Sequence, residues 1–114
     1  MYRVLYYTKA NDECPLKEFI DALGEEPRGK IARLISYLAR LGPDLPRPYA
    51  DTLRDKIREL RVPYGRLQMR ILYFFKDDRI ILTQGFFKKT GPVPDEEIER
   101  AVRRMNDWLA RHGD

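Results

Sequence analysis

The sequence has little cysteine and little histidine, and this limits the chemistry that it can support. Its 114 residues include one cysteine, Cys14, and one histidine, His112. A single cysteine excludes an internal disulfide bond, so we expect a reducing compartment. His112 lies near the end of the chain, where helices fray, and we expect it to be inert.

Longer signals are also missing. No apolar run approaches the roughly 18–20 residues of a membrane span, and residues 1–9 are too short a segment for a secretory signal. Histidine, cysteine and carboxylate residues are nowhere grouped at metal-ligand spacing, and no glycine-rich phosphate loop is present. We therefore expect a cytoplasmic protein with no membrane partner, no metal and no cofactor.

Positive charge is what the sequence has in excess. The formal net charge is +4, and a content of 43% hydrophobic and 35% charged residues is typical of one globular domain, residues 1–114. The segment 53–89 holds ten of the 22 Lys and Arg residues but four of the 18 acidic ones. Because aromatic residues are interleaved with these cations, the segment indicates a surface for a polyphosphate partner.

Residue periodicity predicts a strand and two helices in the first part of the chain. Residues 2–8 are rich in aromatic and β-branched types, which favour a strand. Apolar residues then recur every three or four positions, first from Pro15 to Gly24 and again from Glu25 to Leu41. Because few residues separate these two helices, we expect a helical hairpin.

The second part of the chain reads mainly as strands. Residues 42–50 contain three prolines and are expected to be irregular. Within 65–75, Leu67, Met69, Ile71, Tyr73 and Phe75 alternate with polar residues, which is typical of a strand with one buried face. Lys76, Asp77 and Asp78 form a compact turn. The remaining elements expected are strands at 56–62 and 79–87 and a helix that begins at Pro94.

These elements predict an α+β fold. We expect an N-terminal strand and helix hairpin, then a mostly antiparallel curved sheet of about four strands, with helices on one face and a C-terminal helix. Alternation places Arg66, Gln68 and Arg70 on the exposed face of the sheet. If Leu60 points into the core, Glu59 and Arg61 join them there.

Several short motifs carry a resemblance to a known family. They are Ile-Arg-Glu-Leu-Arg at 57–61, Gly-Arg and Arg-Ile-x-Tyr within 65–73, Gly-Phe-x-Lys-Lys-Thr at 85–90 and Pro-x-x-Glu-Ile at 94–98. Together they resemble the RelE/ParE toxin superfamily, and most of all its HigB-like, phage-derived branch. The resemblance implies a RelE-like fold. This chain has Gln84 where relatives often have a histidine.

The resemblance also implies a function. Members are toxins of type II toxin–antitoxin modules, and many are endoribonucleases that cleave mRNA on the ribosome. The HigB-like branch is usually paired with an antitoxin that carries a helix-turn-helix domain, so that DNA is reached indirectly through the antitoxin. Other members, of the ParE branch, poison DNA gyrase.

Metal-free RNA cleavage requires a base for the 2′-hydroxyl, positive charge at the phosphate and an acid for the leaving oxygen. Given the resemblance, Arg61, Arg66 and Arg70 are candidates for the positive charge, because guanidinium groups match phosphate oxygens. Glu59 is a candidate base, and Lys88 or Lys89 a candidate acid. The candidates for further RNA contacts are Arg58, Gln68, Tyr64 and Gln84.

Each assignment has a structural alternative. Arg66 and Arg70 are also consistent with a solvated sheet face paired with Glu59, and Glu59 with an anchor for Arg61. Lys88 and Lys89 are also typical of a solubilising strand end, and Tyr73 alternates with core residues. The alternative functions are a gyrase-directed inhibitor, an inactive toxin homologue, or a simple RNA-binding domain.

Overall fold

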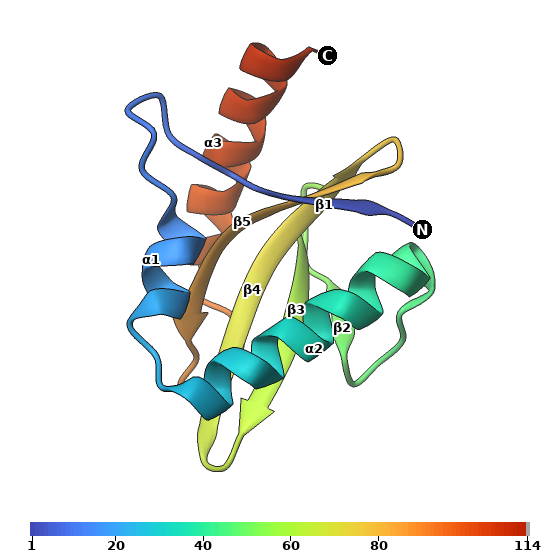
Figure 1. Cartoon of the computed structure of the whole chain (residues 1–114). Helices are drawn as coiled ribbons and strands as arrows, with labels where there is room; N and C mark the ends of the chain where they lie inside the picture. Colours follow the sequence, from blue (N-terminus) through green and yellow to red (C-terminus); the bar gives the residue numbers. More distant parts are fainter. Residues whose placement is uncertain (114) are drawn as a thin grey trace.

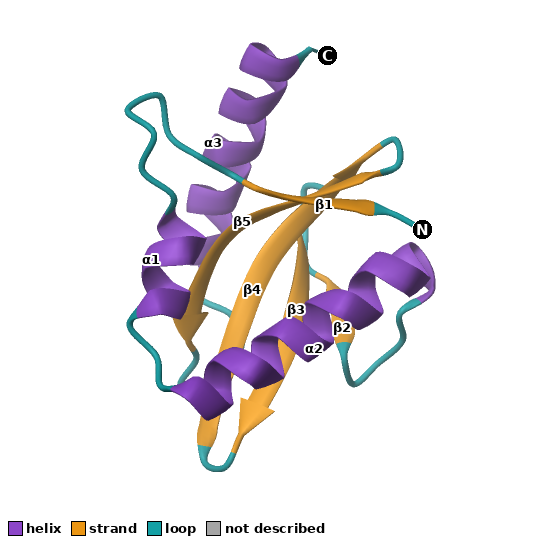
Figure 2. Cartoon of the chain, viewed as in Figure 1, coloured by secondary structure: helices purple, strands orange, loops and turns teal. Residues whose placement is uncertain are grey.

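The computed structural model describes residues 1–113 and contains one five-stranded mixed sheet with three α-helices (Figures 1 and 2). The strand order is β1-β5-β4-β3-β2. The outer strand β1 runs parallel to β5, whereas all other neighbouring strands are antiparallel. The strands are β1 (Arg3–Tyr6), β2 (Ala50–Thr52), β3 (Arg58–Tyr64), β4 (Leu67–Lys76) and β5 (Arg79–Phe87).

The helices begin and end where local chemistry favours it. They are α1 (Pro15–Asp21), α2 (Glu25–Leu41) and α3 (Asp95–His112). Proline opens α1, and acidic residues fill the first turn of both α2 and α3, where the positive end of the helix dipole stabilises them. Within residues 1–113, none of these helices combines the length and apolar character that crossing a bilayer requires.

Both faces of the sheet are covered. Ile71 faces α1 and α2 in one hydrophobic cluster, whereas its neighbour Leu72 belongs to a second cluster with Trp108 of α3. Figure 1 shows α2 in front of the sheet and α3 behind it. The expected α+β fold is confirmed, but α3 lies on the opposite face from the helix hairpin. The reason is that β4 carries buried apolar side chains on both faces from Ile71 to Phe74.

Two smaller differences lie in the proline-rich segment 42–50. It was expected to be irregular, yet Gly42–Asp44 forms a short 3-10 helix and Ala50 begins β2. Strand β2 pairs with β3 at the end of the sheet, so the sheet has five strands where about four were expected. This extra strand brings Ala50–Thr52 beside β3, and a hydrogen bond from the Arg61 nitrogen extends the contact to Tyr49.

A bulge in β5 determines which of its residues face α3. Leu72 pairs with Gln84, but the next residue, Tyr73, pairs with Leu82, which leaves Thr83 as the additional residue. The hydroxyl of Thr83 donates a 3.1 Å hydrogen bond to the Leu72 carbonyl oxygen. After a bulge the alternation of side chains is shifted by one. Gln84 therefore shares the face of Leu72 and Arg70, while Gly85 faces the ring of Phe19 in α1.

Candidate nucleic-acid interface

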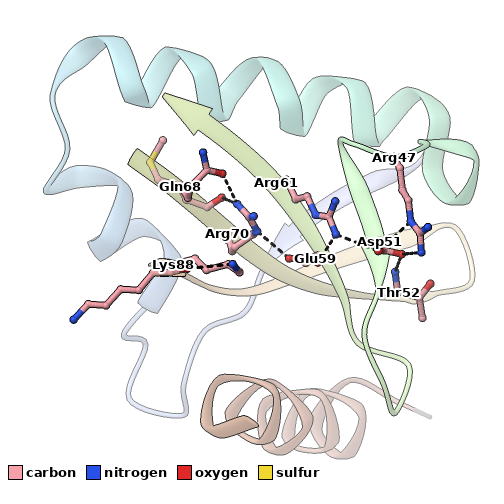
Figure 3. A network of polar contacts seen from close by, with 10 residues as sticks. Arg47, Asp51, Thr52, Glu59, Arg61, Gln68, Arg70 and Lys88 are labelled. Atoms are coloured by element: carbon pink, nitrogen blue, oxygen red, sulfur yellow. Dashed lines mark hydrogen bonds and ion pairs between the residues drawn. The ribbon is translucent and has the colours of Figure 1, made fainter. Parts of the chain in front are cut away.

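A chain of polar contacts crosses three neighbouring strands on the sheet face away from α2 (Figure 3). It begins at Asp51 of β2, whose carboxylate binds Arg61 of β3 at 3.1 Å. Arg61 in turn binds Glu59 at 3.1 Å, and Glu59 binds Arg70 of β4 at 2.9 Å. Strand pairing sets Arg61 directly opposite Arg70. The network therefore fixes two guanidinium groups side by side.

Glu59 is the centre of this network. Its side chain is 5% exposed, and its two carboxylate oxygens accept separate hydrogen bonds, Oε1 from Arg70 and Oε2 from Arg61. A general base needs an oxygen that faces the proton it removes. Since both oxygens are engaged with buried or half-buried cations, this geometry fits an anchor for the two arginines better than a base.

Arg70 is held at two of its three nitrogens. Nε donates to Glu59, and Nη1 donates to the Gln68 side-chain oxygen at 3.2 Å and to the Met69 carbonyl oxygen at 3.1 Å. Within residues 1–113, Nη2 makes no hydrogen bond. A guanidinium that is rigidly held and retains free donors is suited to a phosphate oxygen.

Arg61 is less enclosed than Arg70. Its side chain is 29% exposed, and Nη2 is shared between Asp51 and Glu59. Its Nε atom is buried and has no hydrogen-bond partner in the described part of the chain. Its Nη1 atom makes no hydrogen bond within residues 1–113, so Arg61 also retains an unused donor on this face.

Two predicted cations lie around this pair of arginines. The backbone nitrogen of Lys88 donates to the Gln68 carbonyl oxygen at 2.7 Å, so pairing continues past the end of β5 and Lys88 lies beside Gln68. Its Nζ donates to the Lys89 carbonyl oxygen at 3.1 Å (Figure 3), and Lys89 itself is exposed. Both lysines are thus near the end of the sheet that carries Arg70.

Arg66 occupies a different position from the one expected. It was expected within a strand at 65–75, but Gly65 and Arg66 form the two-residue turn between β3 and β4. Gly65 has a positive φ of 58°, which glycine adopts at little cost and which suits a tight hairpin. Arg66 is therefore an exposed residue at the hairpin tip, and the structure does not bring it into the Glu59 network.

Arg58 and Tyr64 lie on the opposite face of the sheet. The Arg58 guanidinium is 5.2 Å from the centre of the Phe75 ring, which packs on the α2 side. Tyr64 packs on the same cluster, and burial together with the nearby charge of Glu26 raises the pKa of its hydroxyl. These two residues are not brought together with Arg61 and Arg70.

Gln84 is on the Arg70 face but is covered by α3. Its Nε2 donates to the Glu97 carbonyl oxygen at 2.9 Å, and its Oε1 accepts from Arg104 at 3.2 Å. The side chain is buried, and burial also lowers the pKa of Arg104. The expected RNA contact of Gln84 is therefore not available in this arrangement, because both ends of its amide bind α3.

The other singled-out side chains are in the core or far from the network. Tyr73 is fully buried, as its alternation with core residues predicted. His112 lies at the end of α3 against the Trp108 ring, with ring centres 4.8 Å apart. In the described residues there is no group of three or more His, Cys, Asp or Glu side chains placed to hold a metal ion.

Two members of the network were missed by sequence reasoning. Arg47 binds Asp51 through two contacts of 3.1 Å, and Asp51 connects it to Arg61. The pair lies in and beside a segment expected to be irregular, so no periodicity marked it. The one indication in the sequence was that Arg47 and Asp51 carry opposite charges four positions apart, which permits an ion pair.

Comparison with known families gives one match. Residues 18–106, more than half of the chain, match the family model described as "Phage derived protein Gp49-like (DUF891)". The match includes α2, all of the strands from β2 to β5 and most of α3. No curated protein matches the chain.

Proposed function

Because the chain belongs to the Gp49-like family of phage-derived proteins, a family of RelE- and toxin-like proteins, we propose that it is the toxin of a type II toxin–antitoxin system. Within that class we propose a HigB-like, metal-independent endoribonuclease that cleaves mRNA on the ribosome. Its site is the face that carries Arg61 and Arg70. The observation that carries this proposal is the buried Glu59, which holds both guanidinium groups in place.

The proposed reaction is cleavage by the neighbouring 2′-hydroxyl group of RNA. The 2′-hydroxyl gives up its proton to solvent water as its oxygen attacks the adjacent phosphorus, because Glu59 has no free oxygen to accept it. The bond from phosphorus to the 5′-oxygen breaks, and the leaving 5′-oxygen takes up a proton. The product is a 2′,3′-cyclic phosphate. Negative charge grows on the phosphate oxygens during this step, and one preorganised donor at such a charge contributes about 3–4 kcal/mol.

Arg70 fits the role of this donor, with Arg61 beside it. Both are held by Glu59, so they need not reorganise when charge develops. Lys88 and Lys89 lie at the same end of the sheet and remain the candidates for protonating the leaving oxygen. We assign Glu59 to positioning rather than to proton transfer, because neither of its oxygens is free.

The proposed partners follow from the same function. A toxin of this class requires a cognate antitoxin, which we propose carries a helix-turn-helix domain, so that this chain reaches DNA indirectly. Its substrate is mRNA on the ribosome, which places its action in the cytoplasm. The positive face around Arg61 and Arg70 is suited to the RNA.

One observation favours a second candidate function. Gln84 stands where relatives often have a histidine, and its amide is bound by Glu97 and Arg104 beneath α3. Both oxygens of Glu59 are engaged by the two arginines, and the His112 ring packs on Trp108, so neither group is placed to transfer a proton beside Arg70. A non-catalytic protein of the same fold, either a gyrase-directed inhibitor or an inactive homologue, is the alternative.

The test is induction of this chain alone in cells, followed by mapping of mRNA 5′ ends. The control variant is Arg70→Lys, which retains a cation for Glu59 but loses the planar guanidinium. We expect new 5′ ends at in-frame positions of translated messages, strongly reduced in the variant. Arrested growth with intact messages would instead support the gyrase-directed alternative, and normal growth the inactive one.

A further inference from the structure

We propose that the pocket between α2, the loop 46–49 and the free edge of β3 binds an unpaired nucleobase of an RNA whose phosphate lies on Arg70. This inference rests on the RNA-directed function proposed above and adds a base subsite to it. The pocket has a volume of about 310 Å³, at the lower end of ligand pockets. It is lined by Lys30, Leu34, Pro48, Tyr49, Arg61, Pro63, Gln68 and Arg70.

The pocket exists because β2 is shorter than β3. Pairing between them ends with Ala50 opposite Leu60, and one further hydrogen bond of 2.8 Å joins the Arg61 nitrogen to the Tyr49 carbonyl oxygen. Beyond it, the edge of β3 has no neighbouring strand in the described part of the chain. Pro63 on this edge has no N–H group, which makes the edge a poor template for another strand. The edge is therefore better suited to a small flat group than to a peptide strand.

Tyr49 supplies an aromatic surface at this place. The residue is 43% exposed. Its ring meets the Tyr37 ring of α2 edge-on, with centres 6.5 Å apart and planes at 76°. An edge contact supports the ring while leaving surface free, and exposed tyrosine rings are common stacking partners for unpaired RNA bases. Pro48, Pro63 and Leu34 add apolar walls.

The segment that carries Tyr49 is held in place by the same network that orients Arg61. Asp51 binds Arg47 on one side and Arg61 on the other. The Tyr49 nitrogen also donates to the Pro46 carbonyl oxygen at 2.9 Å, which closes a turn. A preordered site loses less entropy when a ligand binds. The Tyr49 ring that would stack on the base and the arginines that would bind the phosphate are therefore held in fixed relative positions before RNA binds.

The charge of the pocket points to a nucleotide rather than to an uncharged ring. Three of its eight lining residues are cationic, Lys30, Arg61 and Arg70, and none is acidic. Two of these cations hold donor atoms that make no hydrogen bond within residues 1–113, Nη1 of Arg61 and Nη2 of Arg70. A phosphate bound by Arg70 and the adjoining base stacked on Tyr49 would therefore lie in the same pocket, the phosphate at its cationic side and the base at its aromatic side.

The test uses the purified full chain and a short single-stranded RNA at low salt, with affinity measured at several salt concentrations. Tyr49→Ala is compared with wild type, with Tyr49→Phe, and with the control Tyr6→Ala, whose tyrosine is 37% exposed on β1. Loss of one stacked base weakens binding by roughly 5- to 150-fold. We expect that loss for Tyr49→Ala alone, with an unchanged salt slope because no phosphate contact is lost.

The possible failures of this inference differ from those of the proposed function. Equal affinity of Tyr49→Ala and wild type would overturn the base subsite and leave the Arg70 face untouched. Loss of antitoxin binding in Tyr49→Ala with RNA affinity retained would also overturn it, since the pocket would be a protein contact. If the wild-type chain binds no RNA at low salt, the subsite is likewise refuted, and mapping of mRNA 5′ ends still decides the function.

Discussion

Arg70 Nε donates a 2.9 Å hydrogen bond to Glu59 Oε1 across two neighbouring strands, and both side chains are less than one-tenth exposed. Glu59 lies diagonally from Arg70, since strand pairing sets Arg61 opposite Arg70 and Leu72 opposite Glu59. The contact therefore depends on long side chains reaching along the sheet. It connects the stability of the fold to the group proposed to bind phosphate.

The first prediction concerns this pair. Arg70→Ala removes one of the two cations that hold the buried Glu59 carboxylate, and breaking a buried ion pair in this way costs about 3–5 kcal/mol. We expect Arg70→Ala to lower the free energy of unfolding, measured by urea denaturation, toward this range. Arg66→Ala, at the exposed hairpin tip, should change it by less than about 0.5 kcal/mol. Equal stability of the two variants would show that Glu59 is not desolvated.

The second prediction concerns alkaline pH. Burial raises the pKa of the Tyr73 hydroxyl from 10.0 to about 12, against an opposing effect of the nearby Arg58 charge. Between these values the unfolded chain has lost the Tyr73 proton while the folded chain retains it. The free energy of unfolding is therefore expected to fall as the pH rises from about 10 to 12, by up to about 3 kcal/mol.

The matched variant for this prediction is Tyr73→Phe, studied by urea denaturation at a series of pH values. It should remove the Tyr73 contribution to the decline above pH 10. At neutral pH it should be at least as stable as wild type, because the Tyr73 hydroxyl is buried without a hydrogen-bond partner in the described residues. Parallel pH profiles for the two proteins would contradict the assignment to Tyr73.

The third prediction compares two glycines. A Cβ atom at Gly85 would lie 2.7 Å from the Phe19 ring, so we expect Gly85→Ala to destabilise the contact between β5 and α1 by about 1–3 kcal/mol. At Gly29, within α2, a Cβ atom would meet nothing within 4 Å. Gly29→Ala should therefore stabilise the helix by about 0.5–1 kcal/mol. Thermal unfolding should show shifts of opposite sign, and a shared direction would refute the proposed close approach at Gly85.

The fourth prediction compares two glutamines on the same face. Gln84→Ala leaves the Glu97 carbonyl oxygen and Arg104 without their buried partner, which costs about 1–3 kcal/mol. Gln68 is exposed, so Gln68→Ala should cost less. Gln84→His should also destabilise the chain. The imidazole nitrogens are placed differently from the amide nitrogen and oxygen, so one ring cannot both donate to the Glu97 carbonyl oxygen and accept from Arg104 in the same positions. A Gln84→His protein as stable as wild type would show that α3 does not depend on this amide.

Local periodicity was sufficient to predict much of the fold. The alternation of Met69, Ile71 and Tyr73 on one face is a property of the strand backbone itself, and the structure has these residues toward α1 and α2. Leu67, at the start of β4 beside the hairpin turn, is exposed instead. The same argument placed Gln68 and Arg70 together. The helix stripes of α2 and α3 were equally local signals.

The candidate site was harder to predict because it depends on how strands pair. The contact between Glu59 and Arg70 needs the register of β3 against β4, which the two-residue turn at Gly65 and Arg66 determines. A strand expected to begin at residue 65 obscured that turn. The position of Arg58 could have been predicted from alternation. Arg58 is two residues before the core residue Leu60 on the same strand, so both side chains face α2.

The bulge at Thr83 had no signal in the sequence. It moves Gln84 to the Arg70 face by shifting the alternation of β5 after Leu82. Whether α3 then covers Gln84 depends on tertiary packing, through Glu97 and Arg104, which lie 13 and 20 residues away along the chain. Propensity and spacing do not report contacts of this kind.

The proposed function depends above all on the guanidinium of Arg70, which we propose stabilises the transition state of RNA cleavage. The most direct measurement is the single-turnover cleavage rate of a defined mRNA on purified translating ribosomes, for wild type and Arg70→Lys, after both are shown to be folded. We predict cleavage to a 2′,3′-cyclic phosphate by wild type, slowed by about 100- to 1,000-fold in Arg70→Lys. Equal rates, or no cleavage by the folded wild-type chain, would contradict it.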